Sequence, residues 1–566
     1  MADFGHSMRR AARKGGIRGL GLAFLLAGLG AGGDFQAASP APAPRRDRTA
    51  VLLAINDVYR IEGLEGEFGG LARVRALRLE LERESPDLLL LHAGDFLFPS
   101  FASRMYRGEQ MISVMNALDG EAGRFDPRMF VTFGNHEFER PKLAEAGLLR
   151  ERIEGSEFGW LGGNITFGRG ADGAPLVDSK NLSRTVLVES GGIRIGIFSL
   201  SLPSLGVEYV TDFEGEQRAA RALTLDLRSR KAEIIVALTH LNAATDRRLL
   251  EALGDDGPDI IIGGHDHEAM AQQVGGRWLL KADSDARTAT VVRLTKRADG
   301  SLLVQHELRA LRGESPAPDA KVQELVNTWQ TRHAEAFCNL AKAPRGCLDE
   351  VYGRTRTDLG GEENKIRGQE TSLGDWVADR MIETFKACGA RAAFVNSGAL
   401  RINRDLSLGS AITRRDVEEL FAYPTPMFLV KIDGATLARV ADQAVRAWPG
   451  SGTWLQIAGF GFRHDTLKRS ASDLTWLDPP GTPVTPSATV LAVTVDYLVN
   501  PDAGDQDGYL MLNRGQIVDG CAANGLDLKT VVIGALKSAE PLGIAPRVEG
   551  RICQGVRGAP CRIPAR

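Results

Sequence analysis

Five short apolar runs in the first half of the chain are each followed within a few residues by Asp, Asn or His. The runs and the residues after them are 51–55 with Asn56-Asp57, 88–91 with Gly94-Asp95, 129–132 with Gly134-Asn135-His136-Glu137, 234–238 with His240, and 260–262 with Gly263-Gly264-His265-Asp266-His267. Such runs, rich in Val, Ile and Leu, are typical of buried strands. Ligands bind at the carboxyl ends of strands in open α/β sheets, so we expect these polar side chains to share one crevice.

The rest of this region, from about residue 48 to 312, alternates expected strands with expected helices. Apolar residues at 71, 74, 77 and 81 form one face of a helix, and 193–198 and 290–294 alternate as half-exposed strands. Pro316 and Pro318 then interrupt the pattern, and 321–336 has helical spacing with Trp329 on its apolar face. We predict a connector at 313–344.

A second α/β-type pattern follows the connector. Residues 371–379 open an expected helix, and 392–395 and 491–495 are expected strands. A chain of 566 residues is too long for a single core. We therefore predict two domains, 48–312 and 345–545, followed by a cysteine-containing tail at 546–566.

Composition adds one exclusion. Hydrophobic residues make up 43% of the chain and charged residues 25%, which is ordinary for a globular protein. The net charge is -3, so no global basic field indicates a nucleic-acid partner, and we predict none.

The first 38 residues have the pattern of a secretory signal peptide. The basic residues Arg9, Arg10, Arg13 and Lys14 precede an apolar, Gly-rich segment at 20–31, and small residues follow at 37–39. The apolar segment is short for a spanning helix. We predict a signal peptide at 1–38, a Pro-containing spacer at 39–47, and a periplasmic or secreted protein with no stable membrane span after cleavage. An uncleaved anchor is the alternative.

All six cysteines lie beyond the five apolar runs, at positions 338, 347, 388, 521, 553 and 561. Their position argues against thiolate ligands in the crevice, and export favours disulfides. Cys338 with Cys347, and Cys553 with Cys561, are close enough in sequence for local bridges. For Cys388 a buried free thiol is an equal alternative.

His265 and His267 are one residue apart just beyond a strand, where two imidazoles can hold a metal ion. A pair of hydrogen-bonded surface histidines is the competing interpretation for this stretch alone. Asp, Asn and His at the ends of five strands favour a metal site over that alternative.

In this order, the five polar groups resemble the motifs of the calcineurin-like metallophosphoesterases. The second domain resembles the C-terminal domain of the 5'-nucleotidase family, which includes bifunctional UDP-sugar hydrolases. Its motifs are Arg367 with Gln369-Glu370, Leu373-Gly374-Asp375, 396–401, 454–459 and Asp507-Gly508-Tyr509. The resemblance implies a four-layer α/β metallophosphoesterase domain, with two mixed sheets flanked by helices, and an α+β substrate domain.

The resemblance also implies two metal ions. One would be held by Asp57, Tyr59, Asp95 and His267, and the other by Asp95, Asn135, His240 and His265. Two cations about 3.5–4 Å apart bind a bridging hydroxide and a phosphate oxygen together. Nitrogen and oxygen ligands without sulfur suit Zn, Mn or Fe, as divalent or mixed-valence ions.

Two positions depart from the family pattern. The family places an Asp three residues after the histidine that resembles His136, which lies against the phosphate and protonates the leaving group or stabilises charge. Here that position is Glu139, for which a solvated carboxylate is the alternative. The family has Asp-x-His where this chain has Asp57-Val58-Tyr59. A phenolate ligand favours a harder metal such as iron. The alternatives are that Tyr59 points elsewhere and water takes its place, or that one metal binds weakly.

The substrate domain has five candidate residues. Trp454 and Tyr509 stand where the family has two aromatic residues that sandwich a base, with a core role as the alternative for Trp454. Arg367 and Arg401 resemble phosphate or ribose contacts. Asn396 would bind the base or stabilise its own loop.

The leading prediction is an exported dimetal enzyme that hydrolyses nucleoside 5'-monophosphates or related nucleotide esters by attack of a metal-bound hydroxide. Its partner would be a small nucleotide, and its state a monomer or homodimer. One alternative keeps the metal core with a non-nucleotide substrate, as in the thiosulfohydrolases that share this two-domain plan. Another is a catalytically impaired nucleotide-binding protein, for which Tyr59 and Glu139 are the reason.

Overall fold

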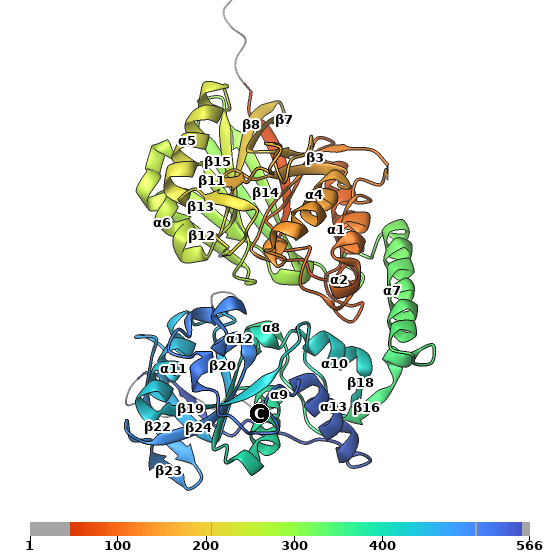
Figure 1. Ribbon diagram of the computed structural model, residues 1–566. Coiled ribbons are helices and arrows are strands. Elements are labelled where there is room, and N and C mark those ends of the chain that lie inside the picture. The colour runs from red at the N-terminus through yellow and green to blue at the C-terminus, as the bar shows by residue number, and fades with distance from the viewer. Residues whose placement is uncertain (1–45, 122, 205, 504–505, 557–566) are drawn as a thin grey trace, which may run out of the picture. The chain divides into compact units, whose positions relative to one another are not determined.

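The computed structural model describes residues 46–121, 123–204, 206–503 and 506–556 (Figure 1). The contacts that the described residues make with one another join them into one unit. The predicted signal peptide and most of the predicted spacer lie outside the described residues. Within the described part of the chain, no helix has the length and apolar character needed to cross a membrane.

A seven-stranded sheet forms half of the first domain, in the order β15-β14-β1-β2-β3-β4-β6. Its strands are β1 (Arg48–Ile55), β2 (Leu89–His92), β3 (Asp126–Thr132), β4 (Phe158–Leu161), β6 (Leu182–Ser183), β14 (Thr288–Lys296) and β15 (Leu302–Ala310). Pairing from β1 to β6 is parallel, and β14 and β15 add antiparallel. The carboxyl ends of β1, β2 and β3 therefore meet at one edge.

A six-stranded sheet forms the other half, in the order β12-β13-β11-β10-β8-β7. Its strands are β7 (Thr185–Ser190), β8 (Ile193–Ser201), β10 (Ile234–His240), β11 (Ile260–Gly263), β12 (Met270–Val274) and β13 (Arg277–Lys281). The inner four pair in parallel, and β7 and β12 are antiparallel at the edges. Both sheets are mixed, as expected.

Alternating apolar side chains join these sheets into four layers. In β1, Leu52 faces the core between the sheets, whereas Leu53 faces the core beneath helix α1 (Leu71–Glu82). Helices α5 (Glu216–Ser229) and α6 (Ala243–Leu253) cover the outer face of β8, β10 and β11 (Figure 1). The predicted order of helix, sheet, sheet and helix is confirmed.

Helix α7 (Ala320–Leu340) lies where the sequence predicts a connecting helix. Its N-cap, Asp319, accepts hydrogen bonds from the backbone of Lys321 and Val322, which satisfies two free donors of the first turn. Val322, Val326 and Trp329 are buried in the core of the first domain. The connector is therefore packed onto that domain along its first half.

The second domain is built on a four-stranded sheet in the order β19-β24-β17-β20. The strands are β17 (Ala392–Asn396), β19 (Met427–Asp433), β20 (Leu455–Ala458) and β24 (Thr489–Val495), and the main helices are α9 (Ser372–Thr384), α11 (Gly434–Arg446) and α13 (Leu528–Ala539). A second sheet, β23-β22-β21-β25, contains β21 (Phe460–Asp465), β22 (Ser470–Leu477), β23 (Pro480–Pro483) and β25 (Ile552–Gln554). This is the expected α+β arrangement.

Shorter elements complete the described chain. They are α2 (Phe101–Tyr106), α3 (Glu109–Met115), α4 (Ala146–Glu154), α8 (Glu363–Ile366), α10 (Arg414–Leu420), α12 (Asp496–Val499), β5 (Ile165–Phe167), β9 (Val210–Phe213), β16 (Val351–Arg354) and β18 (Ala411–Thr413).

Disulfides link the cysteines of the second half of the chain. Cys338 and Cys347 form the predicted local bridge. Cys388 is bonded to Cys521, so the alternative of a free thiol at Cys388 is wrong. The pairing joins residues 133 positions apart, and no local pattern indicates it. Cys553 is also disulfide-bonded, while its predicted partner lies outside the described residues.

Replacing Cys388 and Cys521 together by Ser should destabilise the second domain more than replacing Cys338 and Cys347. In the chain-entropy view, closing a loop of 133 residues lowers the entropy of the denatured state by an amount worth about 5 kcal/mol, and closing one of 9 residues by about 2.6 kcal/mol. Urea unfolding of both double variants measures the difference. Equal losses, or a larger loss for the short loop, would contradict this ordering.

Candidate metal centre

The five strand ends singled out by the sequence meet at the facing edges of the two sheets. The strands β1, β2 and β3 of one sheet lead to Asp57, Asp95 and Asn135, and β10 and β11 of the other lead to His240 and His265. The backbone amide of Asp57 donates to Gly94 O at 3.0 Å, which joins the first two of these ends directly.

Asp57, Asp95 and His240 form the centre of this crevice. One possible ligand atom from each residue lies within 4.8 Å of the other two. All three side chains are fully buried. His240 Nδ1 lies 2.7 Å from Ala93 O, and because a carbonyl only accepts, Nδ1 carries the proton. His240 Nε2 is then directed at the carboxylate, 3.1 Å from Asp95 Oδ2.

Tyr59 and His267 line one side of the centre. The phenol oxygen of Tyr59 lies 2.8 Å from His267 Nε2, 3.3 Å from Asp95 Oδ2 and 3.5 Å from Asp57 Oδ1. His267 Nε2 is 3.2 Å from Asp57 Oδ1. Tyr59 therefore points into the crevice, and the alternative in which it points elsewhere is wrong.

His265 and Asn135 line the other side. His265 Nδ1 lies 3.2 Å from Asn135 Oδ1, and the His265 ring is 5.2 Å from the ring of His240, centre to centre. The backbone amide of His265 donates to Asp57 Oδ2 at 2.9 Å. The seven predicted ligands thus lie together, with Tyr59 and His267 on one side of Asp57, Asp95 and His240, and His265 and Asn135 on the other.

His136 lies beside the two groups. Its backbone amide donates to Asp95 Oδ1 at 2.8 Å, and its Nε2 is 3.8 Å from Asp95 Oδ2. Its Nδ1 is 2.5 Å from Glu139 Oε1, so the longer carboxylate still reaches the imidazole. Glu139 also accepts a hydrogen bond from the hydroxyl of Tyr423, a residue of the second domain. Glu139 is therefore not the freely solvated carboxylate that was its alternative.

The backbone around the crevice adopts conformations that side-chain-bearing residues usually avoid. Asp57, Asp95, His265 and His267 all have positive φ, between 51° and 81°. Gly134 is required for packing, because a Cβ at that position would lie 2.0 Å from Asp95 Oδ1. Left-handed backbone costs roughly 1–3 kcal/mol per residue and concentrates at functional sites.

Glu137 holds the loops that carry these residues. Its two carboxylate oxygens accept hydrogen bonds from the backbone amides of Asp95, Phe96, Leu97 and Gly134 at 2.6–3.0 Å. The side chain is buried, so each bond replaces one that water would otherwise make.

The electrostatics of the crevice favour cations. Burial disfavours the imidazolium of His240, but the carboxylate of Asp95 overcomes burial and raises the His240 pKa to about 10. Burial likewise opposes charge on His267, while Glu363 and Asp57 raise its pKa to about 9. Burial works against ionisation of Asp57, yet His267 and His240 lower its pKa to about 2. Two anionic carboxylates side by side in a buried site attract positive charge strongly.

The residues present fit a pair of metal ions. The donors are carboxylate, imidazole, amide and phenol groups without sulfur, the set that suits Zn, Mn or Fe. His240 Nε2 faces the two carboxylates at 4.0 and 3.1 Å, where it would bind a cation in exchange for its proton. Burial and the carboxylates of Asp95 and Asp57 raise the pKa of Tyr59 well above its ordinary value, and a bound cation would act in the opposite direction.

Several supporting residues were missed by the sequence prediction. Asp285 accepts hydrogen bonds from Tyr59 N at 3.0 Å and Arg60 Nη1 at 2.8 Å. The buried Lys281 ammonium donates to Leu241 O and Gly264 O at 2.6 and 2.8 Å, and so joins the loops that follow β10 and β11. These contacts link segments distant in the sequence, and no local spacing signals them.

The five candidate substrate residues fall into three groups. Arg367 is buried and Arg401 half-buried, and Arg367 Nε and Arg401 Nη1 have no hydrogen-bond partner in the described structure. Asn396 Nδ2 donates to Asp507 Oδ2 at 2.9 Å, which is a loop-stabilising contact. Trp454 and Tyr509 are 1% and 0% exposed and lie in the core of the second domain. Their polar atoms donate to Gln369 O and Thr453 O.

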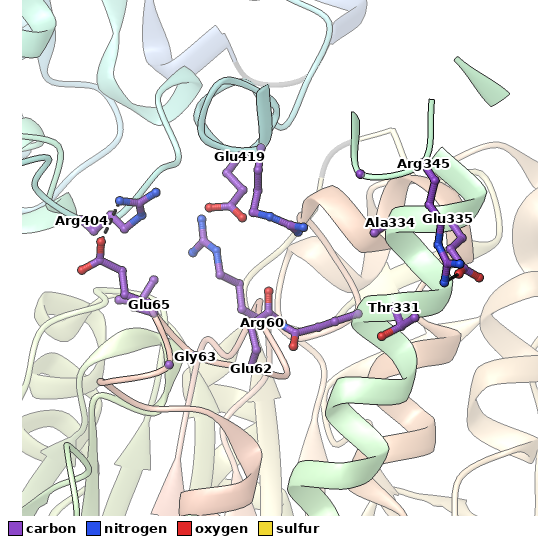
Figure 2. A pocket seen from close by; sticks show the side chains of 15 residues that line it. Arg60, Glu62, Gly63, Glu65, Thr331, Ala334, Glu335, Arg345, Arg404 and Glu419 are labelled. Carbon is purple, nitrogen blue, oxygen red and sulfur yellow. Dashed lines mark hydrogen bonds and ion pairs between the residues drawn. The ribbon is translucent and has the colours of Figure 1, made fainter. Parts of the chain in front are cut away.

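A separate cavity of about 540 Å³ lies beside α7, and it contains none of the predicted site residues. Figure 2 shows Arg60 and Glu419 pointing into it and Arg404 paired with Glu65. The ion pair between Arg404 Nη1 and Glu65 Oε1 measures 2.8 Å. Burial and the neighbouring Glu419 raise the pKa of Glu62, on the same wall, to about 7. Four arginines and four glutamates line this cavity, whereas carboxylates dominate the charge of the crevice.

Comparison with known families agrees with the two-domain arrangement. The calcineurin-like phosphoesterase family matches residues 50–269, and the 5'-nucleotidase C-terminal domain matches residues 351–514. Among curated proteins, the 5'-nucleotidases of Rattus norvegicus and Homo sapiens are each 24% identical, covering 86% of this chain and 85% of their own lengths.

Solved structures show the same fold. The 5'-nucleotidase precursor of Thermus thermophilus superposes with a TM-score of 0.72 at 22% identity, covering 90% of this chain and 100% of its own. The sulfate thiohydrolase SoxB of Thermus thermophilus has a TM-score of 0.67 at 16% identity, covering 91% and 98%. Residues 50–269 thus form a calcineurin-like phosphoesterase domain and residues 351–514 a 5'-nucleotidase C-terminal domain, and the chain is a metal-dependent phosphoric ester hydrolase.

Proposed function

We propose that this protein is an exported dimetal phosphoesterase that hydrolyses nucleoside 5'-monophosphates or related nucleotide esters. The observation that supports it most is the convergence of Asp57, Asp95 and His240, with a pair of polar side chains on either side. Export is inferred from the signal-like pattern of residues 1–38.

In this proposal one cation is held by Asp57, Tyr59, Asp95 and His267, and the other by Asp95, Asn135, His240 and His265. When bound, two such ions neutralise phosphate charge and lower the pKa of water, which is the chemistry of many phosphatases. The arrangement of Asp95 between the two groups suits a bridging carboxylate.

His136 is the proposed acid for the departing alkoxide. Glu139 accepts a hydrogen bond from Nδ1 of the His136 ring, and Nε2 of the same ring is directed toward the crevice. A group held in this way transfers or stabilises a proton without having to reorient. The hydrogen bond from Tyr423 to Glu139 fixes the carboxylate from the other side.

Arg367 and Arg401 are the proposed contacts to the phosphate or ribose. Each keeps a buried guanidinium nitrogen without a partner in the described structure. A buried, unsatisfied N–H is costly, so an incoming oxyanion would recover that energy. Stacking of a base on Trp454 and Tyr509 would require both rings to become exposed, because both are enclosed here.

His136→Ala should lower kcat for adenosine 5'-monophosphate by about 10²–10⁴-fold, because a positioned proton donor is lost. Metal content should stay at the wild-type value, since His136 is outside both ligand groups. Phosphate release and metal analysis measure the two effects. His306→Ala, on the edge strand β15, serves as the control. Loss of metal together with activity would assign His136 to the ligands instead.

Tyr59→Phe should abolish a visible charge-transfer band in protein loaded with ferric iron. The phenol oxygen lies within 3.5 Å of three proposed ligand atoms, so a phenolate–iron bond is expected in the wild type. Absorption spectra at full occupancy report it, with Tyr352→Phe in the second domain as control. Absence of the band in wild-type protein would rule out coordination by Tyr59.

Trp454→Ala should lower the free energy of unfolding by roughly 3–5 kcal/mol, as expected for removing a fully buried large aromatic side chain. KM should change equally little for adenosine 5'-monophosphate and for an aryl phosphate. A rise in KM confined to the nucleotide would instead assign Trp454 to base binding.

The wild-type protein distinguishes the alternative functions. Comparable activity on both esters would favour a hydrolase without nucleotide selectivity. No hydrolysis by metal-loaded protein would favour a binding protein.

A further inference from the structure

One ligand of the proposed metal centre is contacted by a carboxylate from the second domain. His267 Nδ1, in the first domain, lies 2.8 Å from Oε2 of Glu363, the first residue of α8. Both side chains are buried, with 5% and 7% of their surfaces exposed. The hydroxyl of Ser284 donates to the same oxygen at 3.2 Å, and Arg367 forms an ion pair with Glu363.

These partners fix the proton on His267. Ser284 and Arg367 both donate to Glu363, so its carboxylate acts as an acceptor toward every neighbour named here. Nδ1 of His267 must then carry a proton that it donates to Glu363, and Nε2 is directed at Asp57 Oδ1 at 3.2 Å. Carboxylates that accept from the second nitrogen of a metal-binding histidine orient the ring and raise its basicity.

A second chain of contacts holds Glu363 in place and reaches Tyr59. The backbone amide of Glu363 donates to Asn403 Oδ1 at 3.1 Å, and Asn403 Nδ2 donates to Asp285 Oδ2 at 2.9 Å. Asp285 Oδ1 accepts from Tyr59 N at 3.0 Å. Two of the three proposed ligands that are specific to the first cation, Tyr59 and His267, are therefore supported through the second domain.

The proposed second cation has different support. The partners given above for His240 and His265 are Ala93 O and Asn135 Oδ1, which both belong to the first domain. The two halves of the centre are thus unequal: one is complete within the first domain, and the other contacts the second.

We propose that Glu363 is a positioning residue for His267, through which the second domain sets the affinity of one of the two cation sites and leaves the other unchanged. The inference rests on the proposed dimetal function. It follows that one ion is held tightly only while the second domain contributes Glu363.

The matched control is the adjacent Glu362. Its Oε1 pairs with Arg287 Nη1 at 2.8 Å, so it also joins the second domain to the first, and it carries the same charge. It touches none of the proposed ligands in the described contacts. Glu362→Gln therefore reproduces the loss of charge and of an interdomain contact, but not the loss of the carboxylate from His267.

The test is calorimetric titration of metal-stripped wild type, Glu363→Gln and Glu362→Gln with Mn²⁺ alone. We expect two sites in the wild type, one of them weakened about 10–100-fold in Glu363→Gln, and neither changed in Glu362→Gln. Two unchanged sites in Glu363→Gln, or equal weakening in both variants, would overturn the inference.

Two further measurements separate folding and function from positioning. Thermal unfolding of the metal-free variants shows whether Glu363→Gln folds; if it does not, Glu363→Asp, which keeps the charge on a shorter chain, replaces it and should show a smaller weakening of the same site. A wild type that binds no pair of cations would refute the proposed function itself. A wild type that binds two and shows no selective loss would refute only the role of Glu363.

Discussion

The side-by-side burial of the carboxylates of Asp57 and Asp95 is the constraint on which the rest of the crevice depends. Each is fully buried, and removing an ion from water costs several kcal/mol unless opposite charge compensates it. His240 and His267 lie within 3.2 Å of them, and the ordinary preference of buried histidine for neutrality is reversed. The left-handed backbone at four ligands adds a further cost to this arrangement. The hydrogen bonds from four backbone amides to Glu137 stabilise it.

Much of the metal centre could be predicted because its chemistry follows local rules. A buried parallel strand is a short apolar run, and the residue just beyond it must lie at the sheet edge. Asp57, Asp95, Asn135, His240 and His265 all follow from that reasoning, and the family resemblance supplied the pairing of sheets into four layers. The direction of Tyr59 was left open, because a single side chain after a strand can turn either way.

The supporting contacts could not be predicted, for a physical reason. Glu363 is 96 residues from His267, Tyr423 is 284 from Glu139, and Asp285 is 226 from Tyr59. Such pairs depend on the complete tertiary structure, and periodicity carries no information about them. The same holds for Cys388 with Cys521. Burial of Trp454 and Tyr509 is a related case, because an aromatic residue after a strand fits a core as readily as a binding surface.

The parallel pairing of β10 with β8 and β11 has a consequence for insertions and deletions. Within β10, Val236 and Leu238 face the core between the sheets, and Ala237 faces the helices. Alternate residues share a face, so His240 is on the same face as Val236 and Leu238. Adding or removing one residue inside this strand would turn the imidazole toward α6, although the composition would hardly change. Two residues would restore the face but shift the ring by about 7 Å along the strand. A change of length within the seven residues of the strand would therefore displace His240 from the two carboxylates that it faces.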